Sequence, residues 1–231
     1  MNSIVLYHHL GMGDHFICNG LVNELSRSVD KVILICKRHY STTVKHLYED
    51  NLKVQIHVIE KEPDDIVKFC ESSNLPLMRI GFENVNPEDF AKSFYTQLNM
   101  PSEYQYTRFS LPSNLSQSEI FLSKVKQQIG SEYIFVHDES SVGKFDLKIE
   151  SGLPRFIVRK QDTNDVLDYV HTICNASEIH FINSGLYPLI VGLYYKRMIK
   201  TNKIFYHIAR SVSQGGLPIF VPQTFHKVQY L

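Results

Sequence analysis

The sequence predicts an α/β protein built from two halves, each with its own parallel sheet. Short apolar runs alternate with amphipathic segments through residues 1–98, and the alternation resumes after residue 118. Between them, residues 99–118 carry prolines, serines and asparagines without sustained periodicity. Strands and helices that alternate at this spacing form right-handed β-α-β units. We therefore expect two domains, residues 1–110 and 111–231.

The first half contains four expected strands and four expected helices. The strands are short apolar runs at Ser3–Tyr7, Lys31–Cys36, Val54–Ile59 and Leu77–Ile80. The helices show apolar residues at helical spacing, at Asp14–Arg27, Tyr40–Glu49, Asp64–Ser72 and Pro87–Leu98. The last of these begins with a proline and two acids, as helix starts prefer.

The second half repeats this plan, and each half is long enough for a core of its own. Its expected strands are Tyr133–His137, Arg155–Arg159, Glu178–Ile182 and Lys203–His207. Its expected helices are Glu119–Ile129, Asn164–Cys174 and Gly185–Tyr195. The tail from Gln214 onward has chain-breaking residues and then an apolar run, which predicts a final segment that lies against the existing structure.

Composition and charge exclude several classes of protein. Of the 231 residues, 43% are hydrophobic and 21% are charged, as in an ordinary globular protein. The 24 basic and 24 acidic side chains balance, so no general attraction to nucleic acid or anionic lipid is expected. The N-terminus lacks the pattern of a signal peptide, and no apolar run approaches the length of a transmembrane helix. We expect a soluble cytoplasmic protein.

The four cysteines are far apart in the sequence and lie within apolar runs. Because no two of them form a C-x-x-C pair, we expect neither a metal site nor a disulfide framework. They are Cys18, Cys36, Cys70 and Cys174.

The turn after the first strand is the first candidate for a binding site. Residues Gly11 to Asp14 lead directly from a strand into a helix, where backbone N–H groups and the helix dipole favour an anion. A dinucleotide-binding fingerprint would need a third glycine where Phe16 stands, which disfavours an NAD site. In the structural alternative, the glycines only permit a tight turn and Asp14 caps the helix.

A second strand, Glu178–Ile182, runs into a turn of small residues at Asn183, Ser184 and Gly185. Ligands of open α/β sheets bind at the carboxyl ends of strands, where this turn offers backbone N–H groups and a hydroxyl to a diphosphate. Here too a structural alternative exists, in which Asn183 or Ser184 caps the next helix and Gly185 permits the turn.

With these motifs the chain resembles the heptosyltransferase-like glycosyltransferases, whose GT-B fold has two Rossmann-like halves facing across a cleft. Gly13-Asp14 matches the Gly-Asp that opens the family's first helix. Asn183–Gly185 stands at the family's Asp-Thr-Gly or Asp-Ser-Gly turn, with Asn175-Ala176 before the strand. Phe94–Leu98 and Val136–Asp138 resemble short motifs of small glycosyltransferase-like proteins. The chain departs from the family in having Asn183 where an acid is usual.

The resemblance implies transfer of a sugar from a nucleotide-diphosphate sugar to a hydroxyl of a carbohydrate or glycoconjugate acceptor, in glycan or polysaccharide synthesis. Asp14 is then the candidate general base, and the reaction needs no metal or other cofactor. Donor and substrate binding is expected from residues at the strand ends and turns of both halves. These are Gly11, Gly13, His15, His137, Asp138, Lys144, Asn183, Ser184 and Gly185.

The departing diphosphate needs positive charge. Lys144 is the preferred cation, and Arg159 and Arg210 are alternatives, although each of the three is also typical of a solvated surface. The consecutive residues His137, Asp138 and Glu139 do not predict a metal site, because neighbouring side chains of a strand point to opposite faces.

Two other functions fit parts of the sequence. A non-catalytic nucleotide- or carbohydrate-binding module on a glycosyltransferase fold is consistent with Asn183 in place of the acid. An S-adenosylmethionine methyltransferase would need an acidic residue at the end of the second strand to hold the ribose. The sequence has Cys36-Lys37-Arg38 there, which disfavours this class.

Overall fold

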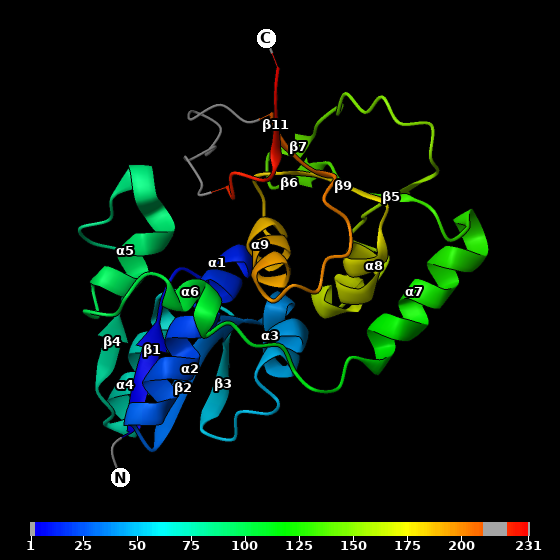
Figure 1. The fold of residues 1–231 in the computed structure, drawn as a ribbon. Coiled ribbons are helices and arrows are strands. Elements are labelled where there is room, and N and C mark those ends of the chain that lie inside the picture. Colours follow the sequence, from blue (N-terminus) through cyan, green and yellow to red (C-terminus); the bar gives the residue numbers. More distant parts are fainter. Residues whose placement is uncertain (1–2, 210–220, 231) are drawn as a thin grey trace. The chain divides into compact units, whose positions relative to one another are not determined.

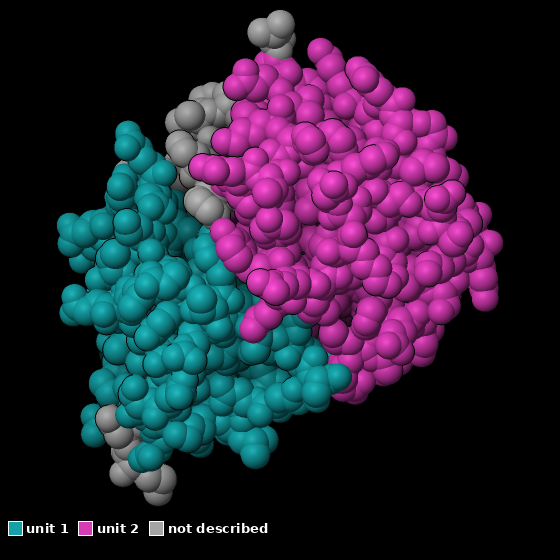
Figure 2. All heavy atoms as spheres, in the orientation of Figure 1, with its two compact units in different colours: residues 1–113 teal, residues 114–231 magenta. Residues whose placement is uncertain are grey.

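The computed structural model describes residues 3–209 and 221–230. The chain divides into two compact units, Met1–Ser113 (unit 1) and Asn114–Leu231 (unit 2), coloured separately in Figure 2. Each unit has its own all-parallel sheet with helices packed on it (Figure 1). This confirms the predicted α/β class with two parallel sheets. Among the described residues, no helix combines the length and the apolar character needed to cross a membrane.

The sheet of unit 1 has four strands in the order β3-β2-β1-β4. Their positions agree with the predicted runs to within one residue, because buried parallel strands are continuous apolar segments. They are β1 (Ser3–Tyr7), β2 (Lys31–Lys37), β3 (Val54–Ile59) and β4 (Leu77–Arg79).

Helices cover both faces of this sheet. Val5, Ile33 and Ile35 form a core cluster with Ile66 of helix α4 (Asp64–Ser73). Helices α2 (Asn19–Ser28) and α3 (Ser41–Leu47) contact β2, and α3 also contacts β3. The short helix η1 (Arg38–Tyr40) precedes α3.

The predicted helix Asp14–Arg27 is wrong in one respect, because the structure divides it into α1 (Met12–Ile17) and α2. The Tyr95 hydroxyl donates to the Ile17 carbonyl at 2.7 Å and accepts from the Leu21 amide. It therefore occupies the place of the hydrogen bond that a continuous helix would make between these two residues. A side chain inserted in this way breaks the helical ladder.

The segment after β4 also differs from its prediction. The expected helix Pro87–Leu98 is a short η2 (Pro87–Asp89) followed by α5 (Phe90–Thr96). The Asn86 side chain accepts from the Glu88 amide at 3.0 Å and so caps η2. A further helix, α6 (Tyr104–Thr107), lies in the stretch expected to be irregular.

The sheet of unit 2 has five strands in the order β11-β10-β9-β5-β8, and all neighbours are parallel. Within the predicted final segment, residues 226–229 form the edge strand β11 beside β10, and residues 214–220 lie outside the described residues. The strands are β5 (Ile134–His137), β8 (Arg155–Ile157), β9 (Glu178–Ile182), β10 (Ile204–Ile208) and β11 (His226–Gln229).

One face of this sheet packs against helical elements. Phe135 of β5 and Phe156 of β8 contact Tyr169 of η3 (Val166–Tyr169), and Phe156 also meets Phe121 of α7 (Ser116–Ile129). Helix α8 (Val170–Asn175) lies beside α7, as Figure 1 shows. Helix α9 (Tyr187–Tyr195) follows β9, and its Tyr187 stacks on Phe181.

On the opposite face, the described residues of unit 2 place an irregular segment where a helix would be expected. Residues 145–153, here called the strap, place Leu147 in a core cluster with Ile134, Val136 and Ile182. The strap begins after a hairpin of β6 (Glu139–Ser140) and β7 (Gly143–Lys144). Because side chains of a strand alternate between faces, helices and strap receive alternate residues of each strand.

We expect Gly20→Ala to destabilise unit 1 by about 1–3 kcal/mol, because a Cβ at Gly20 would collide with the Tyr104 backbone carbonyl where α2 meets α6. Gly152→Ala is the matched control, since its Cβ would meet no atom within 4 Å. Thermal unfolding of both variants measures the effect. Equal melting temperatures would contradict this close helix contact.

Candidate functional site

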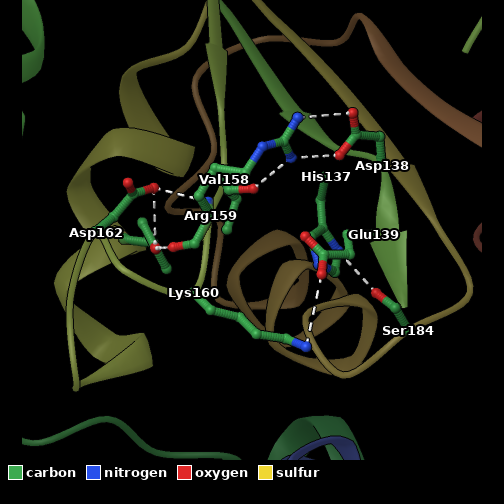
Figure 3. Close-up of polar contacts among 9 residues, drawn as sticks. His137, Asp138, Glu139, Val158, Arg159, Lys160, Asp162 and Ser184 are labelled. Carbon is green, nitrogen blue, oxygen red and sulfur yellow. Dashed lines mark hydrogen bonds and ion pairs between the residues drawn. The ribbon is translucent and has the colours of Figure 1, made fainter. Parts of the chain in front are cut away.

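Three neighbouring strands of unit 2 bring polar residues to one edge of the sheet. Strand β5 lies between β8 and β9, and parallel strands end at the same edge. His137 ends β5, Arg159 follows β8, and Ser184 follows β9. These residues come from segments far apart in the sequence and lie together in Figure 3.

His137 and Ser184 form a hydrogen-bonded pair, with 2.7 Å between Nδ1 and Oγ. The imidazole is buried, and burial lowers the pKa of His137 to about 4, despite the opposing effect of Asp138. His137 is therefore neutral at pH 7, with one ring nitrogen that donates and one that accepts. The pair fixes the position of the Ser184 hydroxyl at the strand ends.

Asp138 holds Arg159 in a two-pronged ion pair. Arg159 Nη1 donates to Asp138 Oδ1 at 2.6 Å, and Nη2 donates to Oδ2 at 3.2 Å. Nη1 also donates to the Val158 carbonyl at 2.7 Å, and the Arg159 amide donates to Asp162 at 2.7 Å. The hydrogen bond with Asp138 raises the pKa of Arg159, so the guanidinium remains charged and is held in one orientation.

Of the other candidate cations, the structure describes Lys144. Lys144 is exposed on the β6–β7 hairpin, whose register places it opposite Glu139. Arg210 lies outside the described residues. Lys160, which the sequence reasoning did not single out, forms an ion pair of 3.5 Å with Glu139 (Figure 3). Of the two candidates that the structure describes, Arg159 is the one whose side chain is fixed at the strand ends.

Asn183, Ser184 and Gly185 are half-buried residues of the turn after β9. The Ser184 carbonyl accepts from the Tyr187 amide at 3.1 Å. Helix α9 begins at Tyr187, two residues later than predicted, because this turn precedes it. The turn thus follows β9 at the same edge of the sheet as His137.

In unit 1 the Gly11–Asp14 turn is built around the Asp14 carboxylate. Gly11 precedes α1 in extended conformation, and its amide donates to Asp14 Oδ2 at 3.2 Å. A Cβ at Gly11 would lie 2.7 Å from the same oxygen, which explains the glycine. Gly13 is part of the first turn of α1. Burial raises the pKa of Asp14 to about 7, although the hydrogen bond from Gly11 acts in the opposite direction.

His15 follows Asp14 in helix α1, is fully buried and packs against His8. The two rings meet edge to face with 4.7 Å between their centres. Burial lowers the pKa of His8 to about 4 and lowers that of His15, so both rings are neutral at pH 7. Neither nitrogen of His15 has a hydrogen-bond partner among the described residues.

A polar cluster at the carboxyl edge of unit 1 was missed by the sequence reasoning. Lys37, which ends β2, forms an ion pair of 2.8 Å with Glu62, and the Tyr7 hydroxyl at the end of β1 donates to the same carboxylate. Burial raises the pKa of Glu62, but the hydrogen bonds from Lys37 and Tyr7 outweigh it and the net pKa is lowered. Charged residues directly after two apolar runs were the available signal.

The described residues contain no group of three histidine, cysteine, aspartate or glutamate side chains placed to hold a metal ion. The side chains gathered at the two sheet edges are carboxylates, the Arg159 guanidinium, the Lys37 ammonium, hydroxyls and neutral imidazoles.

No protein-family model matches the chain, and no curated protein matches it. Two solved structures show similarity over most of its length. A glycosyl transferase family 9 structure from Veillonella parvula DSM 2008 is 10% identical, with 99% of this chain and 85% of the other covered and a TM-score of 0.49. The E. coli heptosyltransferase WaaC with ADP-2-deoxy-2-fluoro heptose is 9% identical, with 99% and 93% covered and a TM-score of 0.43. Similarity at this level assigns neither a function nor site residues.

The raised pKa of Asp14 predicts a pH-dependent stability. Between about pH 4 and 7 the folded state keeps a proton that the unfolded state releases, so the free energy of unfolding falls as the pH rises. Asp14→Asn removes this pH dependence. The free energy of unfolding of the variant should therefore rise relative to that of the wild type by up to about 1.4 kcal/mol per pH unit in that range. Denaturant unfolding at pH 5, 6 and 7 measures the difference.

Asp64→Asn, at the exposed start of α4, is the control for this measurement. A difference between Asp14→Asn and the wild type that stays constant from pH 5 to 7 would show that the Asp14 carboxyl titrates as in the unfolded chain.

Proposed function

We propose that this chain transfers a sugar from a nucleotide-diphosphate sugar to a hydroxyl of a carbohydrate or glycoconjugate acceptor, without a metal or other cofactor. The observation that carries the proposal is the convergence of Ser184, His137 and the Asp138–Arg159 pair at the ends of β9, β5 and β8. Such strand ends are where open α/β sheets bind ligands. The resemblance of the two turns to the heptosyltransferase-like family supports the same function.

In unit 2, Arg159 and Ser184 supply hydrogen-bond donors for the diphosphate. The contacts of Arg159 with Asp138 and Val158 engage three guanidinium N–H groups, and a guanidinium has five. The Nε–H and one Nη2–H therefore remain for phosphate oxygens. The Ser184 hydroxyl is a neutral donor in the tautomer in which His137 Nδ1–H donates to its oxygen. The backbone amides of the turn add further donors, with Asn183 and Gly185 beside them, while Lys144 adds charge from the hairpin. These groups stabilise the diphosphate as it departs.

In unit 1, Asp14 acts as the general base. Its carboxylate takes the proton of the acceptor hydroxyl while the oxygen bonds to the anomeric carbon and the bond from that carbon to the diphosphate breaks. A pKa of about 7 suits this role near neutral pH. Gly11, Gly13 and the buried His15 shape the turn that holds the carboxylate.

A second function is favoured by other contacts of the same residues. Asp14 already accepts from Gly11 as a helix cap would, and Asp138 already neutralises Arg159. A binding module that holds a nucleotide or carbohydrate without turnover requires nothing further. Incubation with a panel of nucleotide sugars separates the two functions, because a transferase shows transfer or slow donor hydrolysis and a module shows binding alone.

The proposal predicts that a nucleoside diphosphate raises the melting temperature, because a ligand that binds only the folded state stabilises it. UDP, GDP and ADP form the test panel together with the monophosphate CMP, and calorimetry then measures the affinity of the best ligand. Arg159→Gln should weaken it by about 10- to 150-fold, as expected for loss of a hydrogen bond to a charged group. Lys160→Gln, which removes the neighbouring exposed cation, should change it little. Equal affinities in all three proteins would refute the role of Arg159.

For the base, Asp14→Asn should lower the rate of sugar transfer by about 10²–10⁴-fold. Nucleotide affinity should stay at the wild-type level, since the donor is held by unit 2. Asparagine retains an oxygen that accepts from Gly11, so helix capping is preserved. Transfer at the wild-type rate by the folded variant would discard Asp14 as the base.

A further inference from the structure

A chain of hydrogen bonds lies on the strap side of the unit 2 sheet, apart from the strand-end residues considered above. His180 Nε2 is 3.4 Å from Glu178 Oε2, and His180 Nδ1 is 2.9 Å from His207 Nε2. His207 Nδ1 is 2.6 Å from the Tyr230 hydroxyl. The Lys148 amide of the strap donates to that hydroxyl at 2.8 Å. Glu178, His180 and His207 are buried.

The Glu178 carboxylate fixes the direction of this chain, because it can only accept. His180 must donate to it from Nε2, so a neutral His180 accepts at Nδ1. His207 must then donate from Nε2 and accept at Nδ1, which leaves the Tyr230 hydroxyl as the donor to His207. With both histidines neutral, each link has one donor and one acceptor, and the buried pair carries no charge.

Through Tyr230, this series of hydrogen bonds connects both the strap and the segment after β11 to the sheet. Tyr230 follows the edge strand β11, and its hydroxyl accepts a hydrogen bond from the Lys148 amide of the strap. Tyr230 also packs against the core cluster that contains Leu147 and Ile182. Among the described residues of unit 2, the strap takes the place of a helix on this face, so these contacts help to keep the apolar face covered.

Several charged groups surround the histidine pair. Lys203 Nζ lies 3.2 Å from Glu178, and Ser151 of the strap hydrogen-bonds the same carboxylate. Arg155 of β8 acts on His180, and Phe205 stacks on its ring. Near Tyr230 lie Asp146 and the Lys148 ammonium, which is 5.5 Å from the ring centre. Glu178 is the carboxylate within hydrogen-bond distance of the pair, and it already forms an ion pair with Lys203.

Burial lowers the pKa of His207 to about 4 and lowers that of His180. Burial raises the pKa of Glu178, but hydrogen bonds from Lys203, His180 and Ser151 outweigh it, so Glu178 remains ionised. The state in which Tyr230 and the strap lie on the sheet therefore binds fewer protons than a state in which water reaches the histidines. Its stability is complete above about pH 6.5 and is lost as the pH falls toward 4.

We propose that the Glu178–His180–His207–Tyr230 chain is an acid-sensitive latch that holds the strap and the C-terminal strand on the sheet. A proton added to either histidine reverses the hydrogen bonds as far as Tyr230 and places a cation beneath the strap. Release of Tyr230 and the strap lets water solvate that cation. The latch opens in acid and closes at neutral pH.

Hydrogen–deuterium exchange of the full chain between pH 5 and 7.5, corrected for the intrinsic exchange rate, tests the latch. In peptides covering residues 145–153, the equilibrium constant for opening should rise by up to about tenfold for each pH unit below 6.5. Tenfold per unit is the limit for uptake of one proton. Peptides covering α7 should keep constant protection. Unchanged strap protection across this range, or equal loss in α7, would overturn the latch.

Two variants test its parts. His207→Gln keeps a donor and an acceptor but removes one of the two histidines that can take up a proton, so the pH dependence of the strap should weaken. Tyr230→Phe removes the fastening hydroxyl, so the Lys148 amide should lose at least tenfold of its protection at every pH.

His171→Gln, on α8 at the opposite face, is the control and should leave the wild-type profile unchanged. Wild-type pH dependence in His207→Gln, or full protection of Lys148 in Tyr230→Phe, would refute the assignment. Where His207→Gln fails to fold, the wild-type profile and Tyr230→Phe decide.

Discussion

The parallel pairing of β5 with both β8 and β9 is the constraint on which the chemistry of unit 2 depends. Backbone hydrogen bonds align Val136 with Ile157 on one side and with His180 on the other. This register brings the three strand ends to one edge, so Arg159 reaches Asp138 and Ser184 reaches His137. The alternation of side chains along the same strands then separates two polar systems. His137 shares its face with Phe135, whereas His180 and His207 lie on the strap side.

Much of this fold could be predicted because buried parallel strands are unbroken apolar runs. Ser3–Tyr7, Val54–Ile59 and Glu178–Ile182 are strands over the predicted residues. Helices were less predictable where a distant side chain intervenes. Periodicity alone gives one helix after Gly11, and the break at Cys18 depends on the Tyr95 hydroxyl, which lies 78 residues from the carbonyl it binds. No local pattern carries that information.

The candidate site shows the same division between residues and contacts. Strand ends and turns identified His137, Asp138, Ser184 and Asp14 as polar groups in positions where ligands bind. The sequence did not reveal that Asp138 holds Arg159, 21 residues away, or that Ser184 bonds His137, 47 residues away. The burial that raises the pKa of Asp14 is likewise a property of packing. Such contacts arise from sheet order, which sequence periodicity does not encode.

The central claim is that the strand ends of unit 2 hold a diphosphate. A crystal structure of the chain with a bound nucleoside diphosphate tests it most directly. The account predicts phosphate oxygens within hydrogen-bond distance of the Arg159 guanidinium and of the Ser184 hydroxyl, with the Asp138–Arg159 pair intact. A diphosphate bound elsewhere on the chain, with no contact to either residue, would contradict it.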